Sequence, residues 1–309
     1  MSRVFLTLAA ALGATGGGLW LAAERVVTAI TAPTPPATER GRGFTPFETG
    51  VRCEDLSIPA EDGSPMRGWL FLNEPSSPAI LACGGYRGRR ADLLGISSAL
   101  WRAGFNVLLF DYRGHGDTGG DTPSPVTLGY RELADTRAAL AYLRARLPES
   151  AVGVIGFSMG AAVALMVAAR ESSVRAVIAD SPFTSQRDIV RYRLRRAARR
   201  AASTLTAPLG DAIVWLADRR LRTRLGFGFA DVQPLHDVSR LTQPLLLIHG
   251  EADREVPVEH SHRIARVAER ARVPLETWFV PHATHCEAYF LDRPTYCRRA
   301  AEFFKRHLG

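Results

Sequence analysis

The stretch VGVIGFSMG occupies residues 152–160 and is followed by AAVALM at residues 161–166. The β-branched, apolar run predicts a buried strand, and the alanine-rich run predicts a helix. Between them, Ser158 stands two residues after Gly156 and two residues before Gly160. Small residues at this spacing allow a tight, strained turn that lifts a side chain above the end of a strand. Ser158 is therefore a candidate nucleophile, placed where the N-terminus of the next helix stabilises negative charge.

Strands and helices alternate around this turn from residue 51 to the C-terminus. Strands are expected at 51–58, 66–72, 79–83, 106–110, 152–155, 176–179, 245–248 and 275–280. The first two predict a hairpin, and helices are expected at 92–102, 126–146, after Ser158, at 258–271 and at 294–307. This alternation predicts an α/β fold, with a doubly wound, mostly parallel sheet of about eight strands. In such sheets ligands bind beyond the carboxyl ends of the strands.

Composition limits the class of protein. The chain has 309 residues, 46% of them hydrophobic, which is enough for a large α/β domain. Its net charge is +8, and Lys305 is the only lysine, so the basicity comes from arginine. No helix-turn-helix, zinc-finger or aromatic-interleaved basic motif is present, and no nucleic-acid partner is expected. The four cysteines have no C-x-x-C spacing and are too few for a disulfide scaffold.

The N-terminus carries an apolar segment. Residues 4–23 contain no charge and end at Glu24 and Arg25, which is long enough to cross a bilayer. We interpret residues 1–30 as an uncleaved membrane anchor. A cleaved signal peptide is the alternative, although no A-x-A site follows directly, and a buried helix is the third. Residues 31–50 hold four prolines among polar residues and predict an extended tether before a domain at 51–309.

An insertion of about residues 183–240 interrupts the alternation. It contains two arginine-rich stretches and is too long for a simple crossover. We interpret it as a helical cap over the carboxyl ends of the strands. Its arginines form either a solvated face or a face that rests against the anionic headgroups of a membrane surface.

A serine nucleophile needs a base, and the base needs an orienting acid. In this topology the expected order along the chain is serine, acid, histidine, with the last two following later strands. Asp253 follows the strand at 245–248, and His285 follows the strand at 275–280. Asp180 is an alternative acid, and His282 is an alternative base. His115 and His249 are interpreted as structural, and no metal-binding motif such as H-E-x-x-H is present.

The charged intermediate of acyl transfer needs two preorganised N–H donors. One is expected from Met159, directly after the nucleophile. The second is expected from Tyr86 in the loop Gly84-Gly85-Tyr86-Arg87-Gly88, which follows the predicted strand at 79–83.

From residue 51 to its end the sequence resembles the α/β-hydrolase superfamily. The resemblance rests on Gly156-Phe157-Ser158-Met159-Gly160, Asp111-Tyr112-Arg113-Gly114-His115-Gly116, His249-Gly250-Glu251-Ala252-Asp253 and the final His285. Within it, the chain resembles serine-aminopeptidase-like and prolyl-oligopeptidase-like bacterial hydrolases with an N-terminal hydrophobic segment. Such relatives often have His-Gly before the oxyanion residue, where this chain has Gly84. The resemblance implies a protein anchored in the bacterial cell envelope, or secreted if the segment is cleaved.

Together these features predict a serine hydrolase with the triad Ser158, His285 and Asp253 and no cofactor or metal. A small-molecule carboxylic ester is the favoured acyl substrate, because an apolar cap suits an acyl chain. A peptidase or amidase is the alternative within enzymes. A non-catalytic member that binds a membrane or a partner is the alternative outside them.

Overall fold

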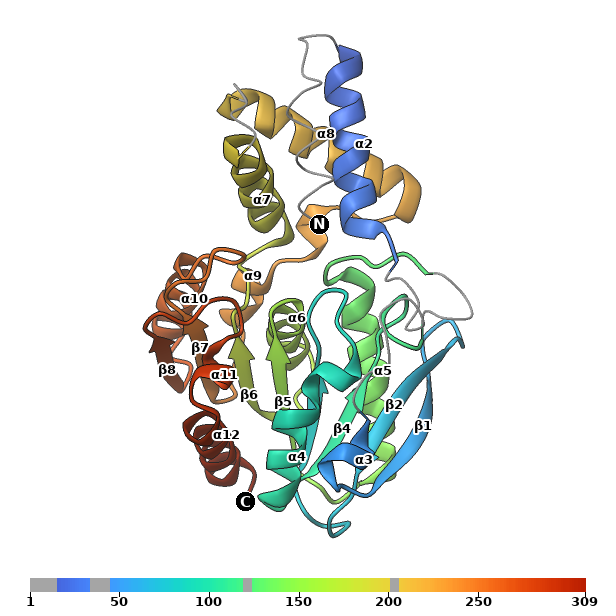
Figure 1. Ribbon diagram of the computed structural model, residues 1–309, viewed down its shortest axis with the longest axis vertical. Coiled ribbons are helices and arrows are strands. Elements are labelled where there is room, and N and C mark those ends of the chain that lie inside the picture. Colours follow the sequence, from blue (N-terminus) through green and yellow to red (C-terminus); the bar gives the residue numbers. More distant parts are fainter. Residues whose placement is uncertain (1–15, 34–44, 119–123, 201–205) are drawn as a thin grey trace. The chain divides into compact units, whose positions relative to one another are not determined.

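The computed structural model describes residues 16–33, 45–118, 124–200 and 206–309 (Figure 1). The chain forms two compact units. The sheet unit comprises Pro33–Thr184 and Pro234–Gly309, and the helical unit comprises Met1–Ala32 and Ser185–Gln233. The helical unit thus groups the N-terminal segment with the insertion, two stretches that lie about 150 residues apart in the sequence.

The sheet unit is built on one eight-stranded sheet, and this confirms the predicted fold class. The strands follow the order β1-β2-β4-β3-β5-β6-β7-β8. The β1–β2 and β2–β4 pairs are antiparallel, and the other pairs are parallel. The strands are β1 Cys53–Pro59, β2 Pro65–Phe71, β3 Ala79–Cys83, β4 Asn106–Phe110, β5 Val152–Phe157, β6 Val174–Asp180, β7 Leu245–Gly250 and β8 Leu275–Val280.

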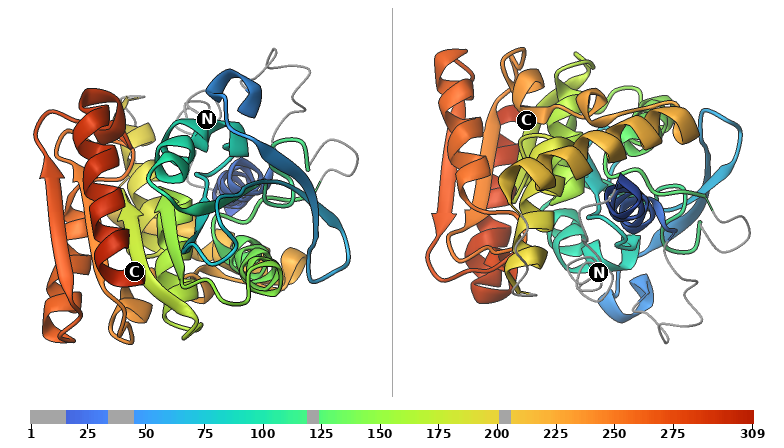
Figure 2. Two further views of the ribbon diagram at one scale, coloured as in Figure 1. Left: turned by 90° about the horizontal axis from the view of Figure 1, so that it is seen from below. Right: turned by 90° about the horizontal axis from the view of Figure 1, so that it is seen from above.

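Helices cover both faces of this sheet (Figures 1 and 2). On one face lie α4 (Leu94–Arg102) and α12 (Arg293–Leu308), and on the other lie α5 (Tyr130–Arg146), α6 (Met159–Ala168) and α10 (Glu259–Arg270). Close packing on the first face depends on Gly153 in β5, where a Cβ would lie 2.6 Å from the ring of Phe304. The short helices are α3 Pro46–Thr49, the 3₁₀ turn Arg90–Leu93, α9 Pro234–Val238 and α11 Ala288–Leu291.

Helix α5 begins at Tyr130, four residues later than predicted. The carboxylate of Glu132 accepts hydrogen bonds from the backbone N–H and the hydroxyl of Thr127, at 2.8 and 2.6 Å, and from the N–H of Gly129 at 2.9 Å. These bonds hold the chain in a turn, in which Leu128 and Gly129 both have positive φ. The turn takes the place of the first predicted helical turn, because its side-chain bonds compete with helical ones.

The helical unit contains α2 (Gly16–Thr31), α7 (Gln186–Arg200), α8 (Ala207–Leu225) and a 3₁₀ turn at Phe229–Asp231. Helix α2 packs against α8. It buries the stripe Ala22, Ala23, Val26, Val27, Ala29 and Ile30, whose spacing places these residues on one helical face. Glu24 forms ion pairs with Arg220 and, at 2.7 Å, with Arg224, both on α8.

The structure describes only part of the predicted N-terminal anchor. Residues 1–15 lie outside the described residues, and so do residues 34–44 of the predicted tether. Among the helices that the structure describes, none has the length and hydropathy needed to cross a membrane. Helix α2 continues past the apolar run, through Glu24 and Arg25, to Thr31.

Candidate active site

Ser158 lies in a strained turn between β5 and α6. Its φ of 54° and ψ of −113° are sparsely populated for a residue with a side chain, and its N–H donates to the carbonyl of Asp180 at 2.8 Å. A Cβ at Gly156 would clash with the carbonyl of Gly160, and a Cβ at Gly160 would clash with the carbonyl of Cys83. The two glycines are therefore required for the turn, as the sequence pattern indicates.

His285 lies within hydrogen-bond distance of Ser158. Its Nε2 is 2.8 Å from the Oγ of Ser158, and its Nδ1 is 2.6 Å from the Oδ2 of Asp253. A carboxylate only accepts hydrogen bonds, so Nδ1 carries the proton and Nε2 accepts from the serine hydroxyl. The three residues come from the carboxyl ends of β5, β7 and β8, which lie at one edge of the sheet.

Asp253 is held by four donors. Its Oδ1 accepts the backbone N–H groups of Glu255 and Val256, at 2.8 and 2.9 Å. Its Oδ2 contacts His285 and, at 3.2 Å, the Nε2 of His249. Burial opposes ionisation of Asp253, but the hydrogen bonds from the two histidines outweigh burial and hold its pKa well below the usual range. Asp253 is therefore a stable anion beside the imidazole.

His249 was interpreted from the sequence as a packed residue of a strand end, and its contact with Asp253 was missed. The residue is fully buried. Its Nε2 lies 2.8 Å from the carbonyl of Val256, which can only accept, so this nitrogen donates. Its Nδ1 lies 2.6 Å from the hydroxyl of Ser261 on α10. The sequence signal was the four-residue spacing between His249 and Asp253, across a turn whose direction the sequence does not specify.

The alternative acid and base occupy different environments. Asp180 is fully buried and accepts hydrogen bonds from the hydroxyls of Ser181 and Tyr296, both at 2.9 Å. Burial raises the pKa of Asp180, against these hydrogen bonds. His282 is exposed in a turn with a φ of 63°. The structure brings His285 and Asp253, rather than these two residues, into the hydrogen-bonded chain with Ser158.

The loop after β3 lies against the Ser158 turn. A Cβ at Gly85 would lie 3.7 Å from the Cβ of Ser158, in ordinary contact. The N–H of Gly88 donates to the carbonyl of Gly85 at 3.0 Å, which closes a tight turn around Tyr86. Met159 is the first residue of α6, so its N–H belongs to the helix turn that has no intrahelical acceptor. Both predicted oxyanion donors thus belong to segments that border Ser158.

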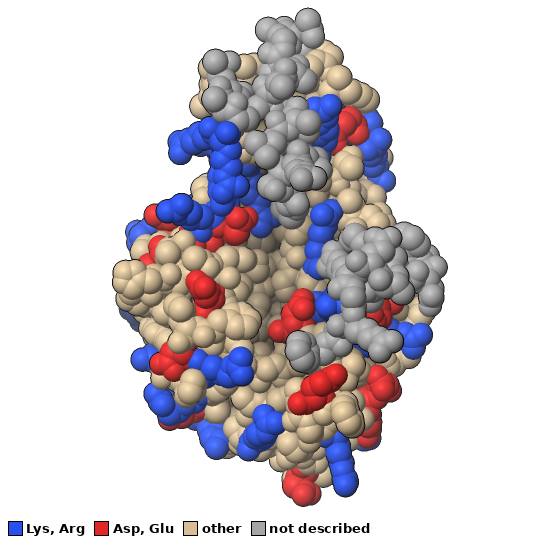
Figure 3. Space-filling view, in the orientation of Figure 1, with Lys and Arg blue, Asp and Glu red and all other residues tan. Residues whose placement is uncertain are grey.

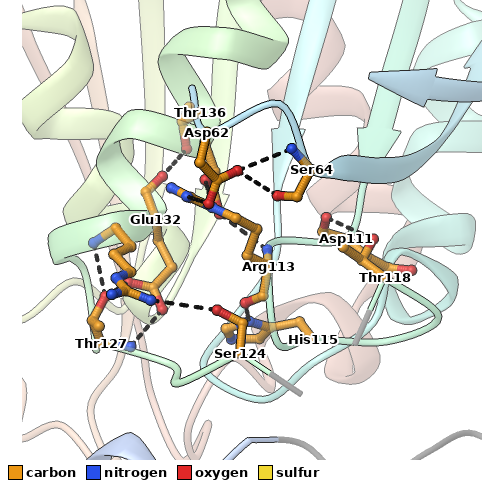
Figure 4. Close-up of polar contacts among 12 residues, drawn as sticks. Asp62, Ser64, Asp111, Arg113, His115, Thr118, Ser124, Thr127, Glu132 and Thr136 are labelled. Carbon is orange, nitrogen blue, oxygen red and sulfur yellow. Dashed lines mark hydrogen bonds and ion pairs between the residues drawn. The ribbon is translucent and has the colours of Figure 1, made fainter. Parts of the chain in front are cut away.

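The loop after β4, residues 111–117, is held by buried ion pairs (Figure 4). Arg90 binds Asp111, and Arg113 binds Asp135 and Asp62, each at 2.6 Å. The Nδ1 of His115 lies 3.0 Å from the carbonyl of Arg113, and His115 is fully buried. These contacts agree with a structural role for His115. Beside the loop is a polar cavity of about 150 Å³, lined by Asp62, Ser64, Pro65, Arg67, Arg113, Gly114, Asp117, Thr118 and Ser124.

Metal coordination finds no obvious place in the described part of the chain. Within those residues, no group of three or more His, Cys, Asp or Glu side chains is arranged to hold a metal ion. The arrangement around Ser158 supplies a nucleophile, a proton acceptor and an anion that orients it. This set of groups supports acyl transfer through a covalent intermediate.

Comparison with known proteins identifies relatives of the whole sheet unit. The family model described as "Alpha/beta hydrolase family" matches residues 79–300. The uncharacterized protein YqkD of Bacillus subtilis is 29% identical over 270 residues, which cover 86% of this chain and 84% of that protein.

Two relatives have names that describe an activity. The esterase Pf2001 of Pyrococcus furiosus has a structure similar to this chain, with a TM-score of 0.69 and 25% identity, covering 90% of this chain and 98% of the esterase. The lysophosphatidylserine lipase ABHD12 of Macaca fascicularis is 29% identical over 187 residues, which cover 59% of this chain and 42% of the lipase.

Proposed function

Because the chain belongs to the alpha/beta hydrolase family, we propose that it is a serine hydrolase that cleaves carboxylic esters through an acyl-enzyme on Ser158. The observation that carries the proposal is the continuous chain of hydrogen bonds from Ser158 through His285 to Asp253, with distances of 2.8 and 2.6 Å. Both lengths lie within the range in which a base accepts a proton directly.

Acylation begins when the Oγ of Ser158 attacks the ester carbonyl carbon. The Nε2 of His285 takes the hydroxyl proton, and the imidazolium that forms is stabilised by the carboxylate of Asp253. Because the pKa of Asp253 lies below its usual range, the carboxylate stays charged over the neutral pH range. His285 then returns the proton to the alkoxide oxygen, and the alcohol leaves.

The negative charge on the carbonyl oxygen needs donors that are already in place. In the proposed mechanism the N–H groups of Met159 and Tyr86 bind this oxygen. The proposal is supported by the position of Met159 at the start of α6, where the helix N-terminus favours negative charge. Deacylation repeats the same steps, with a water molecule in the place of Ser158 and the carboxylic acid as product.

Two comparisons favour esters over amides. The similarity to the Pyrococcus furiosus esterase extends over 90% of this chain. The shorter match is to a protein named as a lipase. An amide is harder to cleave because its leaving amine must be protonated as it departs, and amide cleavage is the second outcome that the experiment below measures.

A substrate panel tests this proposal. The purified chain is assayed with p-nitrophenyl esters of increasing acyl length and, in parallel, with aminoacyl p-nitroanilides. We expect ester hydrolysis to exceed anilide hydrolysis, and the Ser158→Ala variant to lose about 10⁴-fold or more in kcat/KM. Ser98→Ala is the matched control, because it removes a buried hydroxyl that donates to the carbonyl of Leu94 in α4. Equal activity of Ser158→Ala and wild type would contradict the mechanism.

A further inference from the structure

The positive charge of this protein is confined to one of its two units. The helical unit contains 13 of the 39 basic residues and 5 of the 31 acidic residues, a net charge of +8. The remaining 26 basic and 26 acidic residues belong to the sheet unit, whose net charge is zero. The whole excess of the chain thus lies on about a quarter of its residues, and a general solubility role would not require this division.

The carboxylates within the helical unit do not balance this charge. Four of the five take part in ion pairs with arginines of the same unit: Glu24, Asp211, Asp218 and Asp231. Because each carboxylate neutralises one arginine at most, eight positive charges remain. Figure 3 shows basic side chains gathered on the surface of this unit around α7. Arg199, Arg200 and Arg219 are exposed on α7 and α8.

Large apolar side chains are exposed on the same unit. Trp20 and Leu21 on α2 are 45% and 53% exposed, and Trp215 on α8 is 56% exposed. On α8, Trp215 lies one helical turn before Arg219, which places an aromatic ring and a cation on one face. Pairs of this kind are typical of the membrane–water interface, where the indole ring and the guanidinium both lie at the headgroup level.

The exposed side of α2 changes character along its length. Its N-terminal half exposes Trp20 and Leu21, and its C-terminal half exposes Arg25 and Thr28. In the sequence, the apolar half directly follows residues 4–15, which carry no charge. The opposite side of α2 packs on α8, so a lipid contact of the N-terminal segment would bring α8 to the same surface.

We propose that the helical unit docks on an anionic lipid bilayer. Trp20, Leu21 and Trp215 enter the interface, and the unbalanced arginines bind the acidic headgroups. Stable membrane attachment takes two such signals, one apolar and one electrostatic, and the helical unit supplies both. The proposal is independent of the proposed esterase activity, because none of its residues belongs to the site around Ser158.

Vesicle binding by the full chain tests the proposal. Binding is measured to phosphatidylcholine vesicles with and without one-third phosphatidylglycerol, at about 0.1 M salt and at about 1 M salt, where the Debye length is about 3 Å. The test variant is Arg199→Gln/Arg200→Gln/Arg219→Gln. The control is Arg144→Gln/Arg175→Gln/Arg266→Gln, which removes the same charge from exposed positions of the sheet unit. Thermal unfolding of both variants verifies that they are folded.

We expect the wild type and the control to bind the acidic vesicles at least about tenfold more tightly than the neutral ones at low salt. The test variant should lose most of this preference, and high salt should remove it from all three proteins. Equal losses in both variants, or no preference in the wild type, would overturn the proposal. A DNA duplex that binds more tightly than the acidic vesicles, with the same dependence on the three arginines, would overturn it in favour of a nucleic-acid partner.

Discussion

Asp253 joins two histidines, and this arrangement determines how far each residue of the site could be predicted. One oxygen of its carboxylate contacts both His285 and His249, and the other accepts two backbone N–H groups. His249 in turn contacts Ser261 and the carbonyl of Val256. Because each lone pair is occupied, the carboxylate is held in one orientation and keeps the Nδ1 proton of His285 in place.

The roles of the two buried aspartates can be separated by matched substitutions. Asp253→Asn should lower kcat by about 10³ to 10⁴-fold, because an amide N–H facing Nδ1 favours the tautomer in which Nε2 cannot accept the serine proton. Asp180→Asn should stay within about tenfold of wild type, because an amide oxygen still accepts from Tyr296. Steady-state kinetics on one p-nitrophenyl ester checks both. A larger loss for Asp180→Asn would assign the acid to the end of β6 instead.

The sequence predicted the positions of Ser158, Asp253 and His285 because each follows an apolar run that forms a strand. The strand ends lie at one edge of a parallel sheet, so their order along the chain was sufficient. The partner of His249 was not predictable in this way. Its contact with Asp253 depends on the path of the turn at residues 250–256, which short-range pattern does not determine.

At the scale of elements, the β1–β2 hairpin is tied to the loop after β4 by Asp62. The Oδ1 of Asp62 accepts the N–H and the hydroxyl of Ser64, at 3.0 and 2.5 Å, and its Oδ2 pairs with Arg113 (Figure 4). The hydrogen bond from the Ser64 hydroxyl is the main cause that lowers the pKa of Asp62 to about 2, and Arg113 adds to it.

This shift predicts a pH dependence of stability. A carboxyl with a pKa lower in the folded than in the unfolded protein stabilises the fold above its unfolded pKa of about 3.9, and the stabilisation is lost as the pH falls toward 2. Asp62→Asn should therefore lower the free energy of unfolding at pH 7 by about 0.5–1 kcal/mol, because solvent screens a partly exposed pair. The difference from wild type should shrink as the pH falls from 5 to about 3.

Urea unfolding at several pH values measures this difference. Glu61→Gln is the control, because it removes an exposed carboxylate from the same turn. If Asp62→Asn and Glu61→Gln show the same pH profile, the hydrogen bonds of Asp62 do not stabilise the hairpin.

Elements differ in how well their ends were predicted, and the reason is local hydrogen bonding. The strands of the parallel sheet were located within a few residues, since each is an apolar run between turn residues. The start of α5 was predicted four residues early, because the apolar pattern continues through residues 126–129. Only the bonds from Thr127 and Gly129 to Glu132 reveal that these residues form a turn.

At the scale of the whole molecule, the chain separates charge from chemistry. The sheet unit contains Ser158, His285 and Asp253 and has no net charge, and the helical unit contains the entire excess of +8. The sequence predicted a helical insertion at 183–240, but it treated the N-terminal segment as a separate part. The ion pair between Glu24 and Arg220 joins residues 196 positions apart, and a pairing at this distance leaves no local signal in the sequence.

The central claim, that Ser158 is the nucleophile, is tested most directly by covalent labelling. The purified chain is treated with a fluorophosphonate, digested and analysed by mass spectrometry to locate the adduct. We expect one adduct, on the peptide that contains Ser158, in the wild type, and none in Ser158→Ala. An unlabelled wild type, or an adduct that persists in Ser158→Ala, would contradict the account.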